Sequence, residues 1–477
     1  MVRLTRAQQQ ARTRSAVLDA AVEEFAEHGY ADAKIDRIAA RADLTRGAVY
    51  SNFAGKRSLY LAVLLDHAPW HAAAALDLPE VIPVTAAAEG FARAWLERLP
   101  LAGDTAAGGR LRSRSVAGVF DDEPGRAALA QITRLEALLL ARALEACPPV
   151  ARRRVRLAEL MLTLLHGADH LAGTAPGFGD LFDLTRACGH LAGIPLTDEW
   201  DPPHLAFVPP AERCDAPWAP PDGVGGDGLL VILGTARLGA AEEAVRAAAP
   251  DDQITVAVVS SDPAETGALA RLRLTDLTAC LRRTFPAGVA GPLHIDLDDG
   301  PSLAAAIEAA LTGLPPEDPA DATPTHPADA TATHPGDTTA THPGDATPTH
   351  PGDATPTHPG HATSITPTGA PSGPPADSPP DHPAGSPPRH PAGSVPGARS
   401  APTPDHPTGS PSDRTTGSRR GLSGGSTSTR VLRDFSVGDE TEIAVQIRGG
   451  RIVAWASGRG AGHAVAVALR DSGAGQP

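Results

Sequence analysis

The chain has 477 residues, with 48 glycines, 48 prolines and only 4% aromatic residues. Glycine and proline exceed their usual joint share of about 12%, and so few aromatic side chains cannot fill one core of this length, which excludes a single globule and predicts a disordered part. The net charge of −15 excludes a uniformly basic nucleic-acid coat, but residues 1–60 carry ten basic and seven acidic residues and leave room for a local basic module.

Composition divides the chain into six regions. The predicted regions are 1–66 and 67–195, both helical in pattern; 196–227, a proline-rich connector; 228–313, alternating strand-like and helical runs; 314–429, of low complexity; and 430–477, where order returns and a tail follows. The fold class is therefore an all-α N-terminal half followed by an α/β C-terminal domain, which a disordered Pro/Gly/Thr/His-rich insertion interrupts.

The first helix is predicted from Thr13 to Gly29. Its apolar residues recur at spacings of three and four and form one face, while Glu23, Glu24 and Glu27 are expected to face water. Gly29 can end the helix because it adopts a positive φ without a steric cost.

Residues 34–41 and 46–52 are predicted to be two short helices separated by a tight turn. Asp43 tolerates the left-handed conformation that such a turn can require, and Thr45 is a good N-cap for the second of these helices. Two short helices joined by three or four residues make a helix-turn-helix. A further helix is predicted to begin near Gly55.

The candidate DNA-contacting residues follow from this motif, because the N-terminal half of its second helix enters the major groove in DNA-binding versions. The residues of that half are Thr45, Arg46, Gly47 and Ala48. The residues that follow on the outer side are Tyr50, Ser51 and Lys56. Small side chains permit close approach to the duplex, whereas polar ones can donate to bases or to phosphates.

This segment resembles the TetR family of bacterial transcriptional regulators over residues 16–64. The stretches that carry the resemblance are Ala21–Phe25, Gly29–Tyr30, Ile35–Ala39 and Leu44–Lys56, in which Gly47, Tyr50, Phe53 and Lys56 have a specific spacing. The resemblance implies that Thr45, Arg46 and Tyr50 contact DNA and that Lys56 holds a phosphate at a helix start. Asp43 departs from the family, in which glycine is common at this position, and so do Ser51 and Asn52, where larger aromatic or histidine residues are frequent.

Residues 67–195 have helical periodicity throughout. The predicted helices are 85–99, 109–119, 123–146, 150–171 and 179–192. The helix over 150–171 is apolar on two faces, so one side can face the domain core and the other a second subunit. The resemblance implies a domain that binds a small-molecule effector and dimerises through its last two helices. A homodimer would set two recognition helices about 34–36 Å apart and read a palindromic operator in double-stranded DNA.

Met161, His166 and His170 are the candidate ligand-binding residues of this region. His166 and His170 lie one helical turn apart with Asp169 between them, a spacing that suits a metal or a polar ligand. The sequence places no third ligand, so histidines of the core or of an interface are the favoured interpretation. We predict no metal, no cofactor and no catalytic residue.

The C-terminal part predicts a parallel α/β sheet, because strands alternate with helices. The predicted strands are 229–233, 253–260 and 293–297. The predicted helices follow Gly239 as far as Ala249 and cover 264–285 and 302–314. Residues 442–448 and 451–457 indicate a hairpin with a Gly449-Gly450 turn, and a helix over 462–470 closes this part. Residues 228–313 and 430–470 are expected to form one domain.

Residues 314–429 contain His-Pro-Gly-Asp repeats that recur every eight residues between His326 and His358. They favour a solvated linker over a weak metal-binding tail, since ligands on an extended chain are not pre-organised. Upstream, Gly234–Gly239 follows a strand and opens a helix, but it lacks the spacing of a dinucleotide-binding loop and the ending of a P-loop. A generic strand-to-helix turn is therefore favoured over a nucleotide site.

The predicted function is a DNA-binding transcriptional regulator, a ligand-responsive repressor that binds its operator as a homodimer and is not an enzyme. The alternative is a sensor or enzyme domain in residues 228–470, with a nucleotide among its ligands, which the N-terminal module tethers to DNA. A third hypothesis is a scaffold whose proline-rich arm recruits partners. Neither a signal peptide nor an apolar run of about 18 residues is visible, so no membrane partner and a cytoplasmic, nucleoid-associated location are expected.

Overall fold

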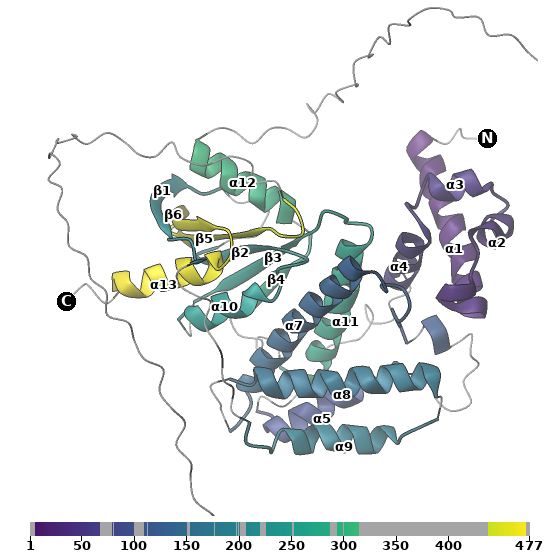
Figure 1. Ribbon diagram of the computed structural model, residues 1–477, viewed down its shortest axis with the longest axis horizontal. Coiled ribbons are helices and arrows are strands. Elements are labelled where there is room, and N and C mark those ends of the chain that lie inside the picture. The colour runs from purple at the N-terminus through teal and green to yellow at the C-terminus, as the bar shows by residue number, and fades with distance from the viewer. Residues whose placement is uncertain are drawn as a thin grey trace, which may run out of the picture. The chain divides into compact units, whose positions relative to one another are not determined.

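Helices make up the first part of the chain, and a sheet with its covering helices makes up the second (Figure 1). The computed structural model describes residues 5–66, 79, 81–99, 109–111, 113–149, 153–175, 177–196, 198, 200, 207–219, 226–249, 252–286, 293–298, 300–313 and 437–473. The predicted low-complexity insertion with its His-Pro-Gly-Asp repeats lies outside the described residues.

The N-terminal helices follow the predicted order. Helix α1 (Arg6–Asp32) begins well before the predicted start at Thr13, because Thr5 and Gln8 form a capping box in which each side chain accepts from the other residue's backbone N–H. Its regular part ends at Gly29, which adopts a φ of 71° as predicted. The helices that follow are α2 (Ile35–Arg41), α3 (Arg46–Tyr50) and α4 (Lys56–Asp66).

The helical middle contains α5 (Val84–Leu96), α7 (Glu123–Glu145), α8 (Val155–Thr174) and α9 (Leu181–Leu191). The predicted helix over 109–119 is wrong, since only 109–111 are helical and the described residues 113–119 form turns. Arg114 and Gly118 adopt φ values of 52° and 71°, which a right-handed helix cannot contain. No helix among the described residues is both long and apolar enough to cross a lipid bilayer.

One mixed sheet forms the second part of the structure, in the strand order β1-β6-β5-β2-β3-β4. Its strands are β1 (Glu212–Pro217), β2 (Gly228–Gly234), β3 (Ile254–Val259), β4 (Leu293–Asp296), β5 (Glu442–Arg448) and β6 (Arg451–Ser457). The pairs β2–β3 and β3–β4 are parallel as predicted, whereas β5, β6 and β1 are joined by antiparallel pairs. The hairpin prediction is confirmed, because Gly449 and Gly450 both adopt the positive φ that its turn requires.

Strand β1 lies inside the predicted proline-rich connector. Its residues are mostly exposed and show no regular apolar alternation, as is common for an edge strand. Pro217 ends the strand, and proline and aspartate are both depleted in strands, so propensity did not indicate it.

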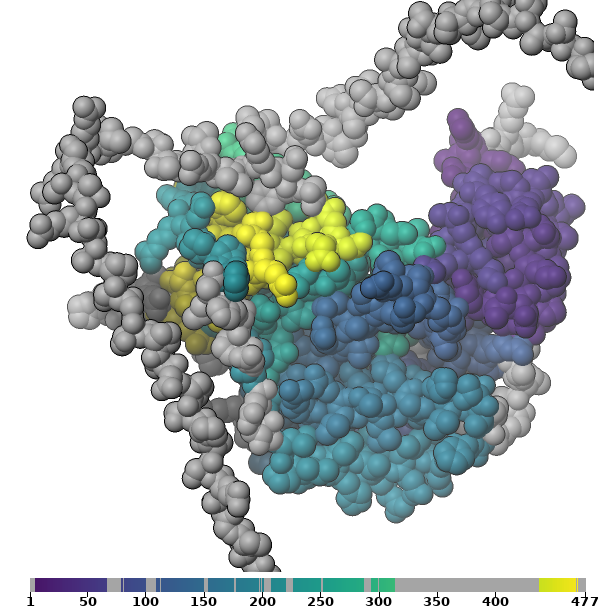
Figure 2. All heavy atoms as spheres, viewed as in Figure 1, coloured from purple at the N-terminus to yellow at the C-terminus, as the bar shows by residue number. Residues whose placement is uncertain are grey.

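Strand β5 pairs with β2 along its whole length, so segments on either side of residues 314–436 share one sheet. Both faces of β2 are buried, as expected for a strand that is apolar at every position. Helix α12 (Gly300–Thr312) covers one face, while α10 (Ala240–Ala247) and α13 (Ala461–Gly473) cover the other (Figure 1). Figure 2 shows the yellow C-terminal residues packed against the teal residues of the sheet.

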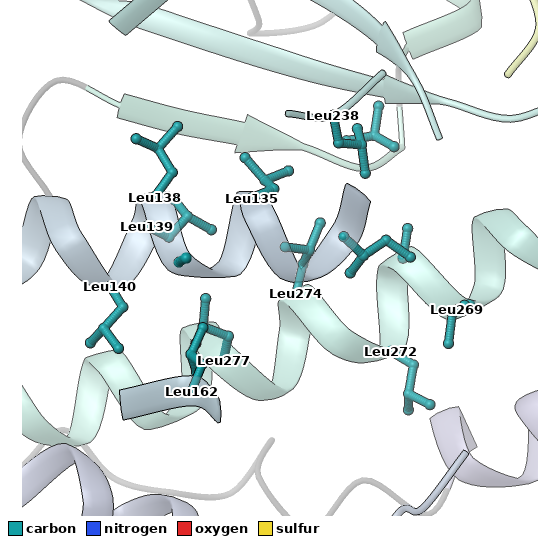
Figure 3. Packing of buried hydrophobic residues seen from close by; sticks show 14 of the residues in the cluster. Leu135, Leu138, Leu139, Leu140, Leu162, Leu238, Leu269, Leu272, Leu274 and Leu277 are labelled. Carbon is teal, nitrogen blue, oxygen red and sulfur yellow. The ribbon is translucent and has the colours of Figure 1, made fainter. Parts of the chain in front are cut away.

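Helix α11 (Thr266–Thr284) follows β3 but packs on α7, α5 and α4. Figure 3 shows leucines of α7, among them Leu135, facing leucines of α11, among them Leu274. Beside them Arg273 donates through Nε and Nη2 to the two carboxylate oxygens of the fully buried Glu136, at 3.0 and 2.7 Å. A helix of the sheet-forming part therefore completes the core of the helical part.

We expect deletion of residues 318–425 to leave the thermal unfolding of the chain unchanged, because β2 and β5 pair through residues outside this stretch. A chain that ends after Gly313 lacks β5, β6 and α13, which uncovers one edge and part of one face of the sheet. Its melting temperature should fall and its cooperativity should be lost, as followed by circular dichroism. Loss of cooperativity in the internal deletion would contradict the shared sheet.

The stability of the chain should depend on the ionisation of Glu136. Burial alone raises the pKa of this carboxyl, but Arg273 and His166 outweigh burial and lower the pKa of Glu136 from 4.5 to about 2. Ionised Glu136 therefore adds about 3 kcal/mol to the free energy of unfolding. This contribution is present above about pH 4.5 and is lost as the pH falls towards 2.

Urea unfolding at pH 6 and pH 3 tests this dependence. The wild-type chain should lose more unfolding free energy between these pH values than Glu136→Gln, whereas Glu159→Gln, at a partly exposed position of α8, should behave like the wild type. Equal losses in the wild type and in Glu136→Gln would show that Glu136 does not carry the effect.

Candidate nucleic-acid interface

A tight turn sets the direction of α3 relative to α2. Asp43 adopts a φ of 54°, the left-handed conformation predicted for it, and the N–H of Leu44 donates to the carbonyl oxygen of Ala39 at 2.9 Å. Val49 of α3 and Phe53 after it are buried, so the inner face of this short helix is fixed by apolar contacts. The turn and the two helices form a helix-turn-helix.

Thr45 caps α3 as predicted. Its Oγ1 accepts from the N–H of Ala48 at 3.2 Å and satisfies one of the free donors at the helix start. An added Cβ at Gly47 would meet only this Oγ1, at 3.8 Å, so the fold itself leaves room for a side chain there. Because Gly47 has no side chain, the backbone at the start of α3 is open to close approach from outside.

Arg46 and Tyr50 form the exposed face of α3. The side chain of Arg46 is 61% exposed, and its Nη2 lies 3.5 Å from the hydroxyl of Tyr50, which is itself 44% exposed. Asp36 on α2 lies 3.3 Å from Nη1 of Arg46 and orients the guanidinium without burying it. Arg46 and Tyr50 therefore both keep hydrogen-bond donors that face solvent.

Ser51 and Lys56 already have partners within the chain. The hydroxyl of Ser51 donates to the carbonyl oxygen of Ala48 at 2.9 Å. Lys56 donates through Nζ to the carbonyl oxygens of Ala31 and Ala33, at 3.0 and 3.1 Å, so one of its three N–H donors is left for a phosphate. Contact of these residues with DNA thus stays a prediction. The structure adds a second role for Lys56, which holds the end of α1.

Glu24 was predicted to face water, and that prediction is wrong. It is fully buried and accepts from the backbone N–H of Lys34 at 3.0 Å and from Nε of Arg37 at 2.6 Å, so it ties α1 to α2. Burial raises its pKa, but the bonds from Arg37 and Lys34 prevail and leave the pKa of Glu24 below its ordinary value. Its place beside Phe25 within the apolar stripe is the sequence signal that could have indicated this burial.

Arg57 joins the helix-turn-helix to the rest of the fold. This residue of α4 forms a short hydrogen bond with the carboxylate of Asp122, the N-cap of α7, and it donates to Oε2 of Glu265 at 3.0 Å. Glu265 directly precedes α11. On the same helix the hydroxyl of Tyr60 donates to the carbonyl oxygen of Ser115 at 2.9 Å. A shift of α7 or α11 would therefore be transmitted to α4.

The three candidate ligand-binding residues have different surroundings. Met161 is fully buried. His166 lies with Nε2 2.7 Å from Nη2 of Arg273, and its ring meets the edge of the Trp95 ring at 5.1 Å between centroids. His170 is exposed and lies one helical turn after His166 on α8. Within the described part of the chain, no group of three or more His, Cys, Asp or Glu residues is placed to hold a metal ion.

The loop after β2 is occupied by the chain itself. The N–H groups of Thr235, Ala236 and Arg237 donate to the carbonyl oxygens of Val259, Asp439 and Gly234 at 2.7–3.0 Å. The carboxylate of Asp439 accepts from the hydroxyl of Thr235 at 2.5 Å. A phosphate at this loop would find its backbone donors used and a negative charge beside it, which agrees with a generic turn.

Comparison with known proteins places the first helices in a family. Residues 17–63 match the bacterial regulatory proteins of the tetR family. The chain is 50% identical over 52 residues to the HTH-type transcriptional regulator SrpR of Pseudomonas putida, which covers 11% of this chain and 24% of that protein. It is 36% identical over 87 residues to an HTH-type transcriptional repressor of Streptomyces coelicolor, which covers 18% of this chain and 40% of that protein. The N-terminal segment is thus a TetR-type helix-turn-helix.

The matches to these two curated relatives cover 52 and 87 residues, and the chain spans about a quarter to two fifths of the length of the relatives named here. Among solved structures, a transcriptional regulator from Rhodococcus sp. Rha1 aligns with 38% of this chain and 94% of its own, at 20% identity and a TM-score of 0.28.

The turn at Asp43 can be tested with two substitutions. Asp43→Gly removes both the side-chain cost of the left-handed conformation and a negative charge, whereas Asp43→Asn removes only the charge. We expect the glycine variant to gain up to about 1 kcal/mol of unfolding free energy in urea and the asparagine variant to gain little. Both should bind duplex DNA more tightly in fluorescence anisotropy, since a charge that repels phosphates is lost. A glycine variant less stable than the wild type would contradict the strain.

Proposed function

We propose that the chain is a ligand-responsive transcriptional repressor that binds a palindromic operator in double-stranded DNA as a homodimer. The observation that carries the proposal is the start of α3, where Thr45, Arg46 and Tyr50 are exposed polar groups around the bare backbone of Gly47. Such a surface fits the major groove, in which small residues permit approach and polar ones reach bases or phosphates. The two relatives described above, a transcriptional regulator and a transcriptional repressor, support the same function. A regulator of this kind acts in the cytoplasm, at the nucleoid.

A homodimer accounts for the apolar surface of α8 and α9. The exposed large apolar residues on and around these two helices are Leu160, Leu171, Phe178, Phe182, Ile194 and Leu196. Phe178 and Phe182 are 70% and 80% exposed, so in a monomer most of the surface of both rings would contact water. A second copy that packs its own α8 and α9 here buries the same patch on both subunits, as a two-fold interface requires.

An effector would act by favouring one arrangement of α4 relative to the domain core. Arg57 connects α4 to the starts of both α7 and α11, so movement of either helix changes the position of the helix-turn-helix. In one state of the dimer the two recognition helices are spaced differently from the operator half-sites. An effector that binds this state more tightly causes the repressor to release the operator. In this proposal the sheet-forming part contributes α11 to the regulatory core and is not an enzyme.

Alanine substitution on α3 tests DNA binding. We expect Arg46→Ala and Tyr50→Ala each to weaken binding by about 1–3 kcal/mol if the lost contact reads a base, on an operator selected from genomic fragments by the wild-type chain. Arg451→Ala, at an exposed position of β6, is the matched control and should bind as the wild type does. Affinity should also fall steeply with salt. Unchanged affinity in both α3 variants would refute the assignment of this helix.

Charge on the apolar surface tests the dimer. Phe182→Asp should shift the chain from dimer to monomer in analytical ultracentrifugation and should weaken operator binding in parallel, because the two half-sites are then bound independently. Phe207→Asp introduces the same charge at another exposed apolar residue, next to Val208, which contacts Gly460 of the sheet-forming part, and should leave the dimer intact. A wild-type chain that sediments as a monomer at micromolar concentration would exclude the proposed assembly.

A further inference from the structure

A group of charged side chains lies buried between α5, α8 and α11. Its members, here called the Arg98–Arg114 cluster, are Trp95, Arg98, Arg114, Asp169 and Asp276. Arg98, Arg114 and Asp276 are only 5%, 6% and 4% exposed. Charges this deep are costly unless they are paired and their hydrogen-bonding groups are satisfied.

The pairing within the cluster is incomplete. Arg98 donates through Nη2 to Asp169 at 2.6 Å and stacks on the ring of Trp95, with its guanidinium carbon 3.8 Å from the ring centroid. Asp276 lies with Oδ2 3.0 Å from Nε of Arg114 and 4.0 Å from Nη1 of Arg98, so one carboxylate is shared between two guanidinium groups. Arg98 is thus held by Asp169, and Arg114 has only the shared carboxylate.

Several buried polar atoms of the cluster have no hydrogen-bond partner. They are Nε, Nη1 and Nη2 of Arg114, Nε of Arg98, Nε1 of Trp95 and one carboxylate oxygen each of Asp169 and Asp276. A buried donor without a partner destabilises the folded chain, and a charged donor does so more strongly. Both terminal nitrogens of one guanidinium are open together, and donors outnumber acceptors. The open positions therefore match a ligand that mainly accepts hydrogen bonds.

We propose that the Arg98–Arg114 cluster binds a small organic acid, whose carboxylate accepts hydrogen bonds from Nη1 and Nη2 of Arg114. The paired N–H groups of a guanidinium fit the two oxygens of a carboxylate in a parallel, bidentate arrangement. The cluster already sets two guanidinium groups against two carboxylates, so a singly charged acid adds one negative charge to it, whereas a phosphate dianion would add two. Burial also lowers the pKa of Arg114, because it disfavours the charged guanidinium. A bound carboxylate would favour that charged form.

The site connects to the DNA-binding module through α11. Asp276 lies on α11, and Glu265 at the start of the same helix holds Arg57 of α4. A carboxylate on Arg114 competes for the guanidinium that Asp276 faces, and so acts on the position of α11. The role of this ligand as the effector rests on the proposed function; its binding to the cluster does not.

Calorimetric titration of the full chain tests the binding site, with benzoate, phenylacetate and octanoate as probes and their amides as uncharged counterparts. We expect at least one acid to bind at least tenfold more tightly than its amide. Arg114→Lys keeps the charge but loses the paired donors, and should weaken that acid at least tenfold. Arg282→Met removes an exposed arginine of α11, the helix that carries Asp276, and should leave the affinity unchanged.

Arg114→Met is the stronger variant, but it leaves Asp276 with less compensation and can lower stability, so its melting is followed in parallel and Arg114→Lys decides if it does not fold. No preference of any acid over its amide, equal affinity in Arg114→Lys, or Arg114-dependent binding of inorganic phosphate in place of the acids would each overturn the site. Operator binding is measured separately. An acid that binds through Arg114 without changing operator affinity upholds the site and contradicts its role as effector, whereas absence of any operator contradicts the proposed function alone.

Discussion

The bidentate ion pair between Arg273 of α11 and Glu136 of α7 holds the two parts of the fold to one another. Glu136 is fully buried and Arg273 is mostly buried, and an unpaired charge at Glu136 would be far more costly than the pair. Leucines of α7 and α11 face one another (Figure 3), and Leu135 and Leu274 directly adjoin the pair in the sequence. Because α11 contributes to the helical core and its neighbouring strands to the sheet, neither part can rearrange without an effect on the other.

The periodicity of apolar residues was sufficient to predict those helices and strands whose burial depends on residues nearby in the sequence. The helices of the DNA-binding module, the β5–β6 hairpin and the strands β2 to β4 have apolar patterns and turn residues, such as Gly449 and Gly450, that specify them directly. The position of α11 could not be predicted in this way. Its apolar residues predict a buried helix, but they do not say which elements bury it. For the same reason Glu24 was assigned to water, since its partners come from α2.

The candidate DNA surface depends on few long-range contacts, and this is why sequence reasoning describes its geometry well. Thr45 and Asp43 act through the backbone beside them, so the cap and the turn were predictable from residue type. The structure adds what arrives from farther along the chain: the carbonyl oxygens that occupy Lys56, and the two carboxylates that hold Arg57. The Arg98–Arg114 cluster had no sequence signal at all, because its members come from separate helices and from a turn.

The pairing of β2 with β5 has a consequence for how the chain is made. Residues 228–234 leave the ribosome about two hundred residues before their neighbour at 442–448 is synthesised. At about 5–20 residues per second this interval is on the order of 10–40 s. During that time one side of an entirely apolar strand is uncovered and open to pairing with another nascent chain. Slow or crowded translation is thus the stage at which this protein is most exposed to aggregation.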